Sequence, residues 1–174
     1  MCGIVGYVGS READSILVAG LRKLEYRGYD SAGVATIVDG DIEVRRAVGK
    51  LDNLVEVLST RPVHGSIGIG HTRWATHGRP SEHNAHPHRS GDVVVIHNGI
   101  IENYVDLRER LIAEGRQVVS ETDTEVISHL IDMEMNGNRD LLDATRSALA
   151  HLEGSFAVVA MSRHEPGRLI TAKN

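Results

Sequence analysis

Apolar residues recur at helical spacing in five segments of the chain. Between Asp14 and Leu24, three leucines are separated by three or four residues, which brings their side chains to one face of a helix. Thr122 to Glu125 fits a capping box before the fourth segment. A second helix is predicted with Leu51, Leu54, Val55 and Leu58 on one face, and a third follows Asn103 with Leu107, Leu111 and Ile112 on one face. Two more helices are predicted over 126–131 and over 141–151.

Apolar segments without helical spacing predict the strands. They cover 2–8, 32–38, 42–48, 66–72, 93–97, 156–161 and 169–172. Asp39-Gly40 between two of them is a strong hairpin signal. The strand over 93–97 is expected to end at Asn98-Gly99. Strands that follow one another closely, with the helices grouped, favour an α+β fold with antiparallel sheet.

Two segments carry neither pattern. Arg73 to Gly91 contains mainly His, Gly, Pro and polar residues, and a loop of that length in a compact domain is usually functional or disordered. Glu25 to Asp30 is polar and interrupted by glycine, so it is also predicted to be a loop. The segment from Arg73 to Gly91 is therefore the first candidate for a functional site.

Composition and charge exclude several classes of function. The 174 residues carry a net charge of −5 and no basic run, which argues against a nucleic-acid-binding surface. No segment approaches membrane-spanning length, and the apolar opening is too short for a signal peptide. The single cysteine excludes an internal disulfide framework. We expect a cytoplasmic protein of one domain that binds neither nucleic acid nor membrane.

Cys2 is that single cysteine, and it directly follows the initiator methionine. Removal of Met1 would leave a residue with both a thiol and a free α-amine. The thiol is a strong nucleophile once a base removes its proton, and an α-amine that titrates near pH 8 can serve as that base. The alternative is a lone thiol that packs as a small apolar group at the start of a buried strand.

Three further residue sets are candidates for a site. Asn98 and the Gly99 N–H can together donate two hydrogen bonds to one oxygen, as an oxyanion hole requires, although Asn-Gly is also a common turn. Arg73 can grip a carboxylate and Asp123 an ammonium group, and the pair would then hold the two charged ends of an α-amino acid. A solvated arginine and an acid favoured by a helix dipole are the ordinary alternatives.

The long segment holds two more candidates. His83, His86 and His88 have spacing compatible with a metal site, but no cysteine lies nearby, and a polar loop with one or two structural histidines is favoured. Trp74, the only tryptophan, lies in this polar segment. It is interpreted either as a lid that excludes water from a site or as a core residue.

Six motifs in order along the chain resemble the class II glutamine amidotransferases. They are Met-Cys-Gly-Ile-Val-Gly at the start, Leu-Glu-Tyr-Arg-Gly-Tyr-Asp-Ser-Ala-Gly over 24–33, His-Thr-Arg-Trp-Ala-Thr-His-Gly over 71–78, Asn-Ala-His-Pro-His over 84–88, His-Asn-Gly-Ile-Ile-Glu-Asn over 97–103 and Ser-Glu-Thr-Asp-Thr-Glu-Val-Ile over 120–127. Within that family they are most similar to the glutaminase domain of members that transfer ammonia to fructose 6-phosphate to make glucosamine 6-phosphate.

The resemblance implies an N-terminal-nucleophile hydrolase fold, a four-layer αββα sandwich. It also implies hydrolysis of the side-chain amide of L-glutamine to glutamate and ammonia, with no organic cofactor and no metal. The roles it implies are Cys2 as nucleophile, Asn98 and Gly99 as oxyanion hole, Arg73 and Asp123 as ligands of the glutamine α-carboxylate and α-ammonium, Trp74, Thr76 and His77 in a loop over the substrate, and Arg27 and His86 near the site.

The resemblance also sets expectations for the whole protein. Residues 2–174 are expected to form a glutamine amidotransferase domain that is incomplete at its C-terminus, with the sugar-isomerase domain that accepts the ammonia absent. The full-length protein is expected to be a homodimer. Two alternatives stay open: a non-catalytic glutamine-binding module, and the glutaminase domain of another class II member such as an amidophosphoribosyltransferase.

Overall fold

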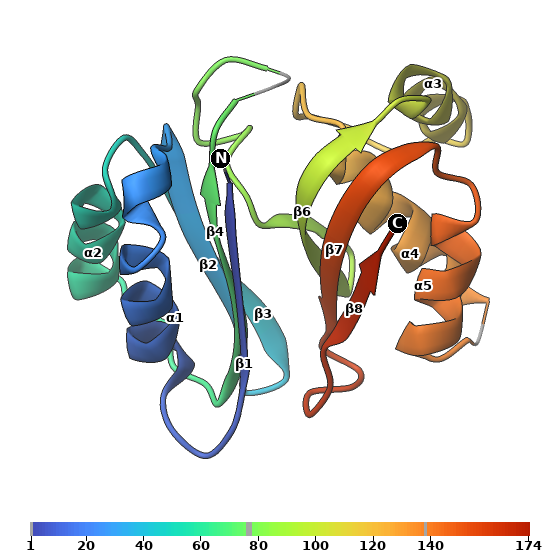
Figure 1. The fold of residues 1–174 in the computed structure, drawn as a ribbon. Coiled ribbons are helices and arrows are strands. Elements are labelled where there is room, and N and C mark those ends of the chain that lie inside the picture. The colour runs from blue at the N-terminus through green and yellow to red at the C-terminus, as the bar shows by residue number, and fades with distance from the viewer. Residues whose placement is uncertain (1, 76–77, 138) are drawn as a thin grey trace.

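The computed structural model of the protein describes residues 2–75, 78–137 and 139–174, and within them two antiparallel sheets face each other (Figure 1). The first sheet has the order β1-β4-β2-β3 and the second β5-β6-β7-β8. The strands are β1 (Gly3–Val8), β2 (Ser31–Val38), β3 (Asp41–Val48), β4 (Ile67–Arg73), β5 (His88–Ser90), β6 (Val93–Ile101), β7 (Gly154–Ser162) and β8 (Ile170–Lys173).

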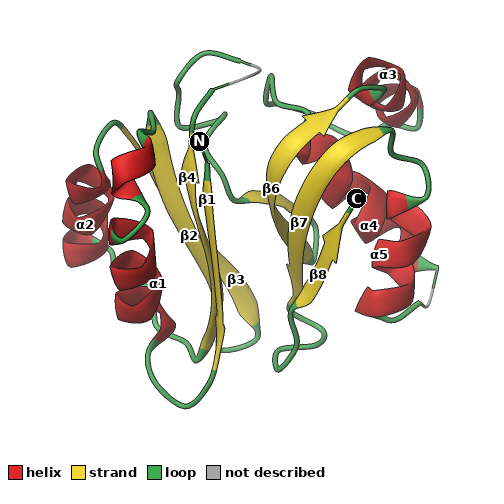
Figure 2. Cartoon of the chain, viewed as in Figure 1, coloured by secondary structure: helices red, strands yellow, loops and turns green. Residues whose placement is uncertain are grey.

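Helices cover the outer face of each sheet, so the chain forms four layers (Figure 2). On the first sheet lie α1 (Ala13–Arg22) and α2 (Leu51–Thr60), and on the second lie α4 (Thr124–Asn136) and α5 (Leu141–Leu149). α3 (Tyr104–Ala113) packs beside α4. The expected α+β fold and αββα order are confirmed. The segment predicted as a loop over 25–30 contains one turn of 3₁₀-helix at Glu25–Arg27.

Three apolar clusters fill the spaces between the four layers. Because neighbouring strand residues point to opposite faces, Val158 packs toward the helices while Val159 packs toward the first sheet. The same alternation divides Val34 from Ala35 in β2. Both faces of the central strands are therefore buried, which explains why the sequence shows them as continuous apolar segments.

Four predictions about elements are wrong. β6 continues through Asn98-Gly99 to Ile101, because both residues pair with β7, opposite Ala157 and Phe156. The segment predicted to lack structure contains β5, which is only three residues long and gives no periodic signal. Ile112 is 51% exposed, unlike Leu107 and Leu111 on the same helix.

The predicted capping box is the fourth. The hydroxyl of Thr122, the predicted cap, lies instead 3.0 Å from Ser120 Oγ and 3.1 Å from His88 Nε2. α4 begins at Thr124, and the side chain of its N-cap residue, Asp123, makes no cap hydrogen bond. Its carboxylate instead accepts the backbone N–H of Ile101, at 2.9 Å, and so ties the start of α4 to the end of β6. Glu125 accepts backbone N–H groups of Val119 and Ser120 in the preceding segment.

Candidate active site

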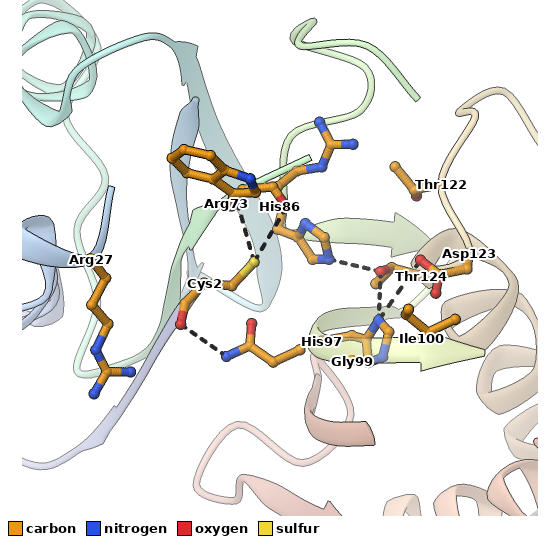
Figure 3. Close-up of a pocket in the computed structure, with 12 residues that line it drawn as sticks. Cys2, Arg27, Arg73, His86, His97, Gly99, Ile100, Thr122, Asp123 and Thr124 are labelled. Carbon is orange, nitrogen blue, oxygen red and sulfur yellow. Dashed lines mark hydrogen bonds and ion pairs between the residues drawn. The ribbon is translucent and has the colours of Figure 1, made fainter. Parts of the chain in front are cut away.

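A cavity of about 600 Å³ opens where β1 begins and β4 and β6 end, near the start of α4. Figure 3 shows its lining side chains, which come from segments far apart in the sequence. They are Cys2, Arg27, Arg73, Trp74, His86, His97, Asn98, Gly99, Ile100, Thr122, Asp123 and Thr124. Among the residues that the structure describes, the cavity thus contains every one that the resemblance assigned to the site, whereas His83 and His88, considered for a metal site, do not line it. Thr76 and His77, also predicted for the site, lie outside the described residues.

Cys2 is partly exposed, and its sulfur is held by the backbone of Trp74. The Trp74 N–H donates to Sγ at 3.2 Å, and the Trp74 carbonyl lies 3.6 Å from the same sulfur. Asp30 fixes this part of the chain, since its carboxylate accepts the N–H of Ala75. The arrangement anchors the thiol at the cavity wall while leaving it accessible to a small molecule.

Asn98 and Gly99 lie beside Cys2, near the C-terminal end of β6. The Asn98 Nδ2 donates to the Cys2 carbonyl oxygen at 3.3 Å. Gly99 has φ of +133°, a backbone conformation that residues with a side chain rarely adopt. A Cβ atom there would lie 2.2 Å from the Ser155 carbonyl oxygen, so this position accepts only glycine.

The two charged candidates are buried at the cavity. Arg73, 3% exposed, donates through Nη2 to the Gly78 carbonyl at 2.9 Å, and its Nη1 lies 3.7 Å from an Asp30 carboxylate oxygen. Asp123, 4% exposed, holds Ile101 through Oδ2, and its Oδ1 lies 4.0 Å from His97 Nδ1. A buried cation and a buried anion in one cavity form a site suited to a zwitterion.

A threonine joins two histidines in the cavity wall. The Thr124 hydroxyl lies 2.8 Å from His86 Nε2 and 2.9 Å from His97 Nδ1 (Figure 3). Burial, followed by the neighbouring His71, lowers the pKa of His86 well below its ordinary value, so this imidazole is neutral at pH 7. The wall therefore presents neutral hydrogen-bonding groups beside the charged pair.

Two other predicted residues, Trp74 and Arg27, are exposed at the edge of the cavity. Trp74 is 54% exposed, and its ring lies over Gly28, where a Cβ would come within 2.7 Å of the indole; the interpretation of Trp74 as a core residue is wrong. Arg27 is exposed, donates to the Tyr26 hydroxyl at 3.2 Å and lies on the opposite side of Cys2 from Asp123 (Figure 3).

Sequence reasoning gave no role to four residues that line the cavity: His97, Ile100, Thr122 and Thr124. Each lies one or two residues from a predicted site residue, on the same strand or at the same helix start. Closeness in sequence to a predicted site residue was the only signal available for these four, and it does not indicate which neighbouring side chains point into the cavity. Among the described residues, no group of three or more His, Cys, Asp or Glu side chains is arranged to hold a metal ion.

The chain is similar to known proteins in both sequence and fold. Residues 71–174 match the sequence model of a family described as "Glutamine amidotransferase domain". The chain belongs to the glutamine amidotransferase family. Within the residues that the structure describes, no helix is long and apolar enough to cross a membrane.

Curated members of this family match along the whole chain. A glutamine–fructose-6-phosphate aminotransferase (isomerizing) of Clostridium tetani is 55% identical over 99% of this chain, and one of Zymomonas mobilis is 53% identical over 99%. In both cases the match covers 28% of the relative. The chain therefore spans just over a quarter of the length of these amidotransferases.

Solved structures of amidotransferases share the fold. A glutamine phosphoribosylpyrophosphate amidotransferase from B. subtilis aligns with a TM-score of 0.83 and 28% identity, over all of this chain and 37% of that chain. A structure of the allosteric regulatory enzyme of purine biosynthesis aligns with a TM-score of 0.84 and 29% identity, over 100% of this chain and 37% of that one. The chain thus has the predicted N-terminal-nucleophile hydrolase fold.

Proposed function

We propose that this domain hydrolyses the side-chain amide of L-glutamine to glutamate and ammonia, with Cys2 as the nucleophile. The observation that carries the proposal is the placement of the Cys2 sulfur, the Asn98 amide, the Arg73 guanidinium and the Asp123 carboxylate around one cavity. A non-catalytic glutamine-binding module would need the charged pair but would have no use for a thiol beside an oxyanion-type donor.

The first chemical step forms a bond between Cys2 Sγ and the amide carbon of glutamine. In a mature chain that begins at Cys2, the α-amine accepts the thiol proton. The carbonyl oxygen becomes an oxyanion, and Asn98 Nδ2 and the Gly99 N–H donate to it. When the C–N bond breaks, the amine returns a proton and ammonia leaves. Water then hydrolyses the thioester to glutamate and frees the thiol.

Recognition of glutamine rests on both of its charged ends. We assign the α-carboxylate to Arg73, whose guanidinium is held in place by Gly78 and Asp30, and the α-ammonium to Asp123. Both groups are already buried and oriented, so binding requires little side-chain reorganisation. We assign to Trp74 and Arg27 places at the mouth of the site, and to Thr76 and His77 a part in binding the substrate.

The similar relatives are glutamine–fructose-6-phosphate aminotransferases, and this name points to fructose 6-phosphate as the acceptor of the ammonia. We propose that this domain supplies ammonia to a sugar-isomerase domain of the whole protein for glucosamine 6-phosphate synthesis. We further propose that the whole protein is a dimer. The 50–55% identity to these aminotransferases, against 28–29% to the two solved structures described above, favours this branch of the family.

One sample can test processing, nucleophile and turnover together. Intact mass is measured before and after treatment with a glutamine-analogue electrophile, and glutamate release is measured on the same protein. The expected result is a chain that begins at Cys2, gains one adduct and releases glutamate. Cys2→Ala should lose both the adduct and turnover, whereas Cys2→Ser should keep glutamine binding. Full glutaminase activity in Cys2→Ala would contradict the proposal.

A further inference from the structure

The side chain of Asn98 must be oriented for its proposed role. Only the Nδ2 end can donate to an oxyanion, yet the two ends of the amide are nearly the same size, so packing alone does not select one. Nδ2 points to the Cys2 carbonyl oxygen, at 3.3 Å. The opposite end, Oδ1, lies 2.7 Å from Nε2 of His71 on the neighbouring sheet.

His71 faces only one side-chain hydrogen-bond partner. Its side chain is fully buried in β4, and among the residues that the structure describes its Nδ1 makes no hydrogen bond, although the His97 backbone lies near the ring. Its ring stacks on His86, with the ring centroids 4.0 Å apart and the planes 28° apart. A neutral imidazole carries one proton, and placing it on Nε2 satisfies the short contact with Asn98 Oδ1.

We propose that His71 is a positioning residue that fixes the Asn98 amide by donating its Nε2–H to Oδ1. This inference rests on the proposed glutaminase function, because it explains how that reaction keeps its oxyanion donor. With the His71 donor in place, a flipped amide would bring its NH₂ group against a second donor and its oxygen against the Cys2 carbonyl. Without that donor, Oδ1 can turn toward the developing negative charge.

The electrostatics of the ring support this role. Burial lowers the pKa of His71 to about 4, while the Asn98 side chain and the His97 backbone partly offset that effect. The ring is therefore neutral at pH 7, and the position of its single proton decides whether it donates or accepts at Nε2. Stacking on His86 holds the ring plane, and Thr124 in turn holds His86 at 2.8 Å.

Two variants separate positioning from packing. His71→Phe keeps a flat ring against His86 but removes the donor, whereas His71→Gln keeps an N–H donor. For His71→Phe we expect kcat for glutamine hydrolysis to fall roughly 10- to 100-fold, since loss of one oxyanion donor costs up to about 10³-fold. KM should change less than about twofold, and His71→Gln should recover part of kcat. His151→Phe, at an exposed position, is the matched control.

Inhibitor affinity gives a second readout. The aldehyde analogue of glutamine forms a tetrahedral adduct with a thiol and needs the oxyanion donors, whereas glutamate binds through its charged ends without them. His71→Phe should weaken the aldehyde at least tenfold and leave glutamate binding within about twofold. Equal weakening of both ligands, or unchanged kcat in a folded His71→Phe protein, would overturn the proposal.

The tautomer can be measured without turnover. In protein labelled with ¹⁵N at histidine, His71 should show the proton on Nε2 and a bare Nδ1 at pH 7. A proton on Nδ1 would overturn the inference even if the variants do not fold. If the wild-type protein neither hydrolyses glutamine nor reacts with the electrophile, the proposed function fails, while the tautomer still reports separately on His71.

Discussion

At the scale of single residues, Asp123 has two tasks that are experimentally separable. One carboxylate oxygen accepts the Ile101 N–H at 2.9 Å, and the charge faces the cavity. Asp123→Asn keeps an oxygen for Ile101 but removes the charge. A hydrogen bond to a charged group contributes about 1.5–3 kcal/mol, so KM for glutamine should rise roughly 10- to 100-fold with a much smaller change in kcat. Steady-state kinetics measures both.

Asp106→Asn is the control for this substitution, because Asp106 is an exposed acid in the first turn of α3. It removes the same charge from the protein without touching the cavity. If Asp106→Asn raised KM as much as Asp123→Asn, net charge rather than a contact with the substrate ammonium would be responsible. An unchanged KM in Asp123→Asn would remove Asp123 from the binding site.

At the scale of secondary structure, the pairing of β6 with β7 constrains the backbone of Gly99. Gly99 combines a φ of +133° with a Cβ position 2.2 Å from the Ser155 carbonyl on β7. Backbone strain of this kind costs about 1–3 kcal/mol before the steric clash is added. Gly99→Ala should therefore lower the free energy of unfolding by more than about 2 kcal/mol. Urea denaturation followed by circular dichroism measures the change.

Gly167→Ala is the matched control, since a Cβ at Gly167 meets nothing within 4 Å. Its free energy of unfolding should stay within about 0.5 kcal/mol of wild type. If Gly99→Ala were equally harmless, the strand pairing of Gly99 opposite Phe156 would be contradicted.

The start of α4 gives a second prediction at this scale. The buried Glu125 carboxylate accepts the N–H groups of Val119 and Ser120 and so holds the segment that leads to Asp123. Glu125→Gln weakens two charge-assisted hydrogen bonds, and we expect the free energy of unfolding to fall by about 1–3 kcal/mol. Exposed Glu109 supplies the control, Glu109→Gln, whose midpoint in urea should match wild type. Equal midpoints for both variants would contradict the bracing role.

These same elements show what local sequence patterns reveal. The hairpin at Asp39-Gly40 was predicted correctly because both residues adopt positive φ, as the turn chemistry requires. Asn98-Gly99 carries the same turn signal, yet β7 pairs with it and the strand continues. Thr122 to Glu125 matches a capping box, yet its acids bind backbone outside the helix. Tertiary partners override local preference at both positions, and both belong to the candidate site.

At the scale of the whole molecule, apolar segments in the sequence predict which residues form strands but not which strands pair. The first sheet places β4 between β1 and β2, a contact between segments more than 30 residues apart that no local pattern encodes. The layer order came from the resemblance to known amidotransferases. The burial of the histidines was also not predictable, because His71, on the first sheet, becomes a neighbour of His86 only when the chain folds.

The burial of these histidines makes the free energy of unfolding sensitive to acid pH. Burial lowers the pKa of His71 to about 4, and burial and the Arg46 charge lower the pKa of His88 to about 3. In the unfolded chain both titrate near 6.5. Below that pH the unfolded state binds more protons than the folded state, so the free energy of unfolding falls as pH drops from about 6.5 toward 4. Each histidine contributes about 1.4 kcal/mol per pH unit in that window.

His88→Gln tests this linkage, because glutamine can keep a hydrogen bond to Thr122 but does not titrate. Between pH 7.5 and pH 5, wild type should lose roughly 2 kcal/mol more of its free energy of unfolding than His88→Gln does. Urea denaturation at a series of pH values measures both curves. His151→Gln replaces an exposed histidine and should follow the wild-type curve. Parallel curves for wild type and His88→Gln would mean that His88 takes up protons equally in both states, and the acid sensitivity would have to arise elsewhere.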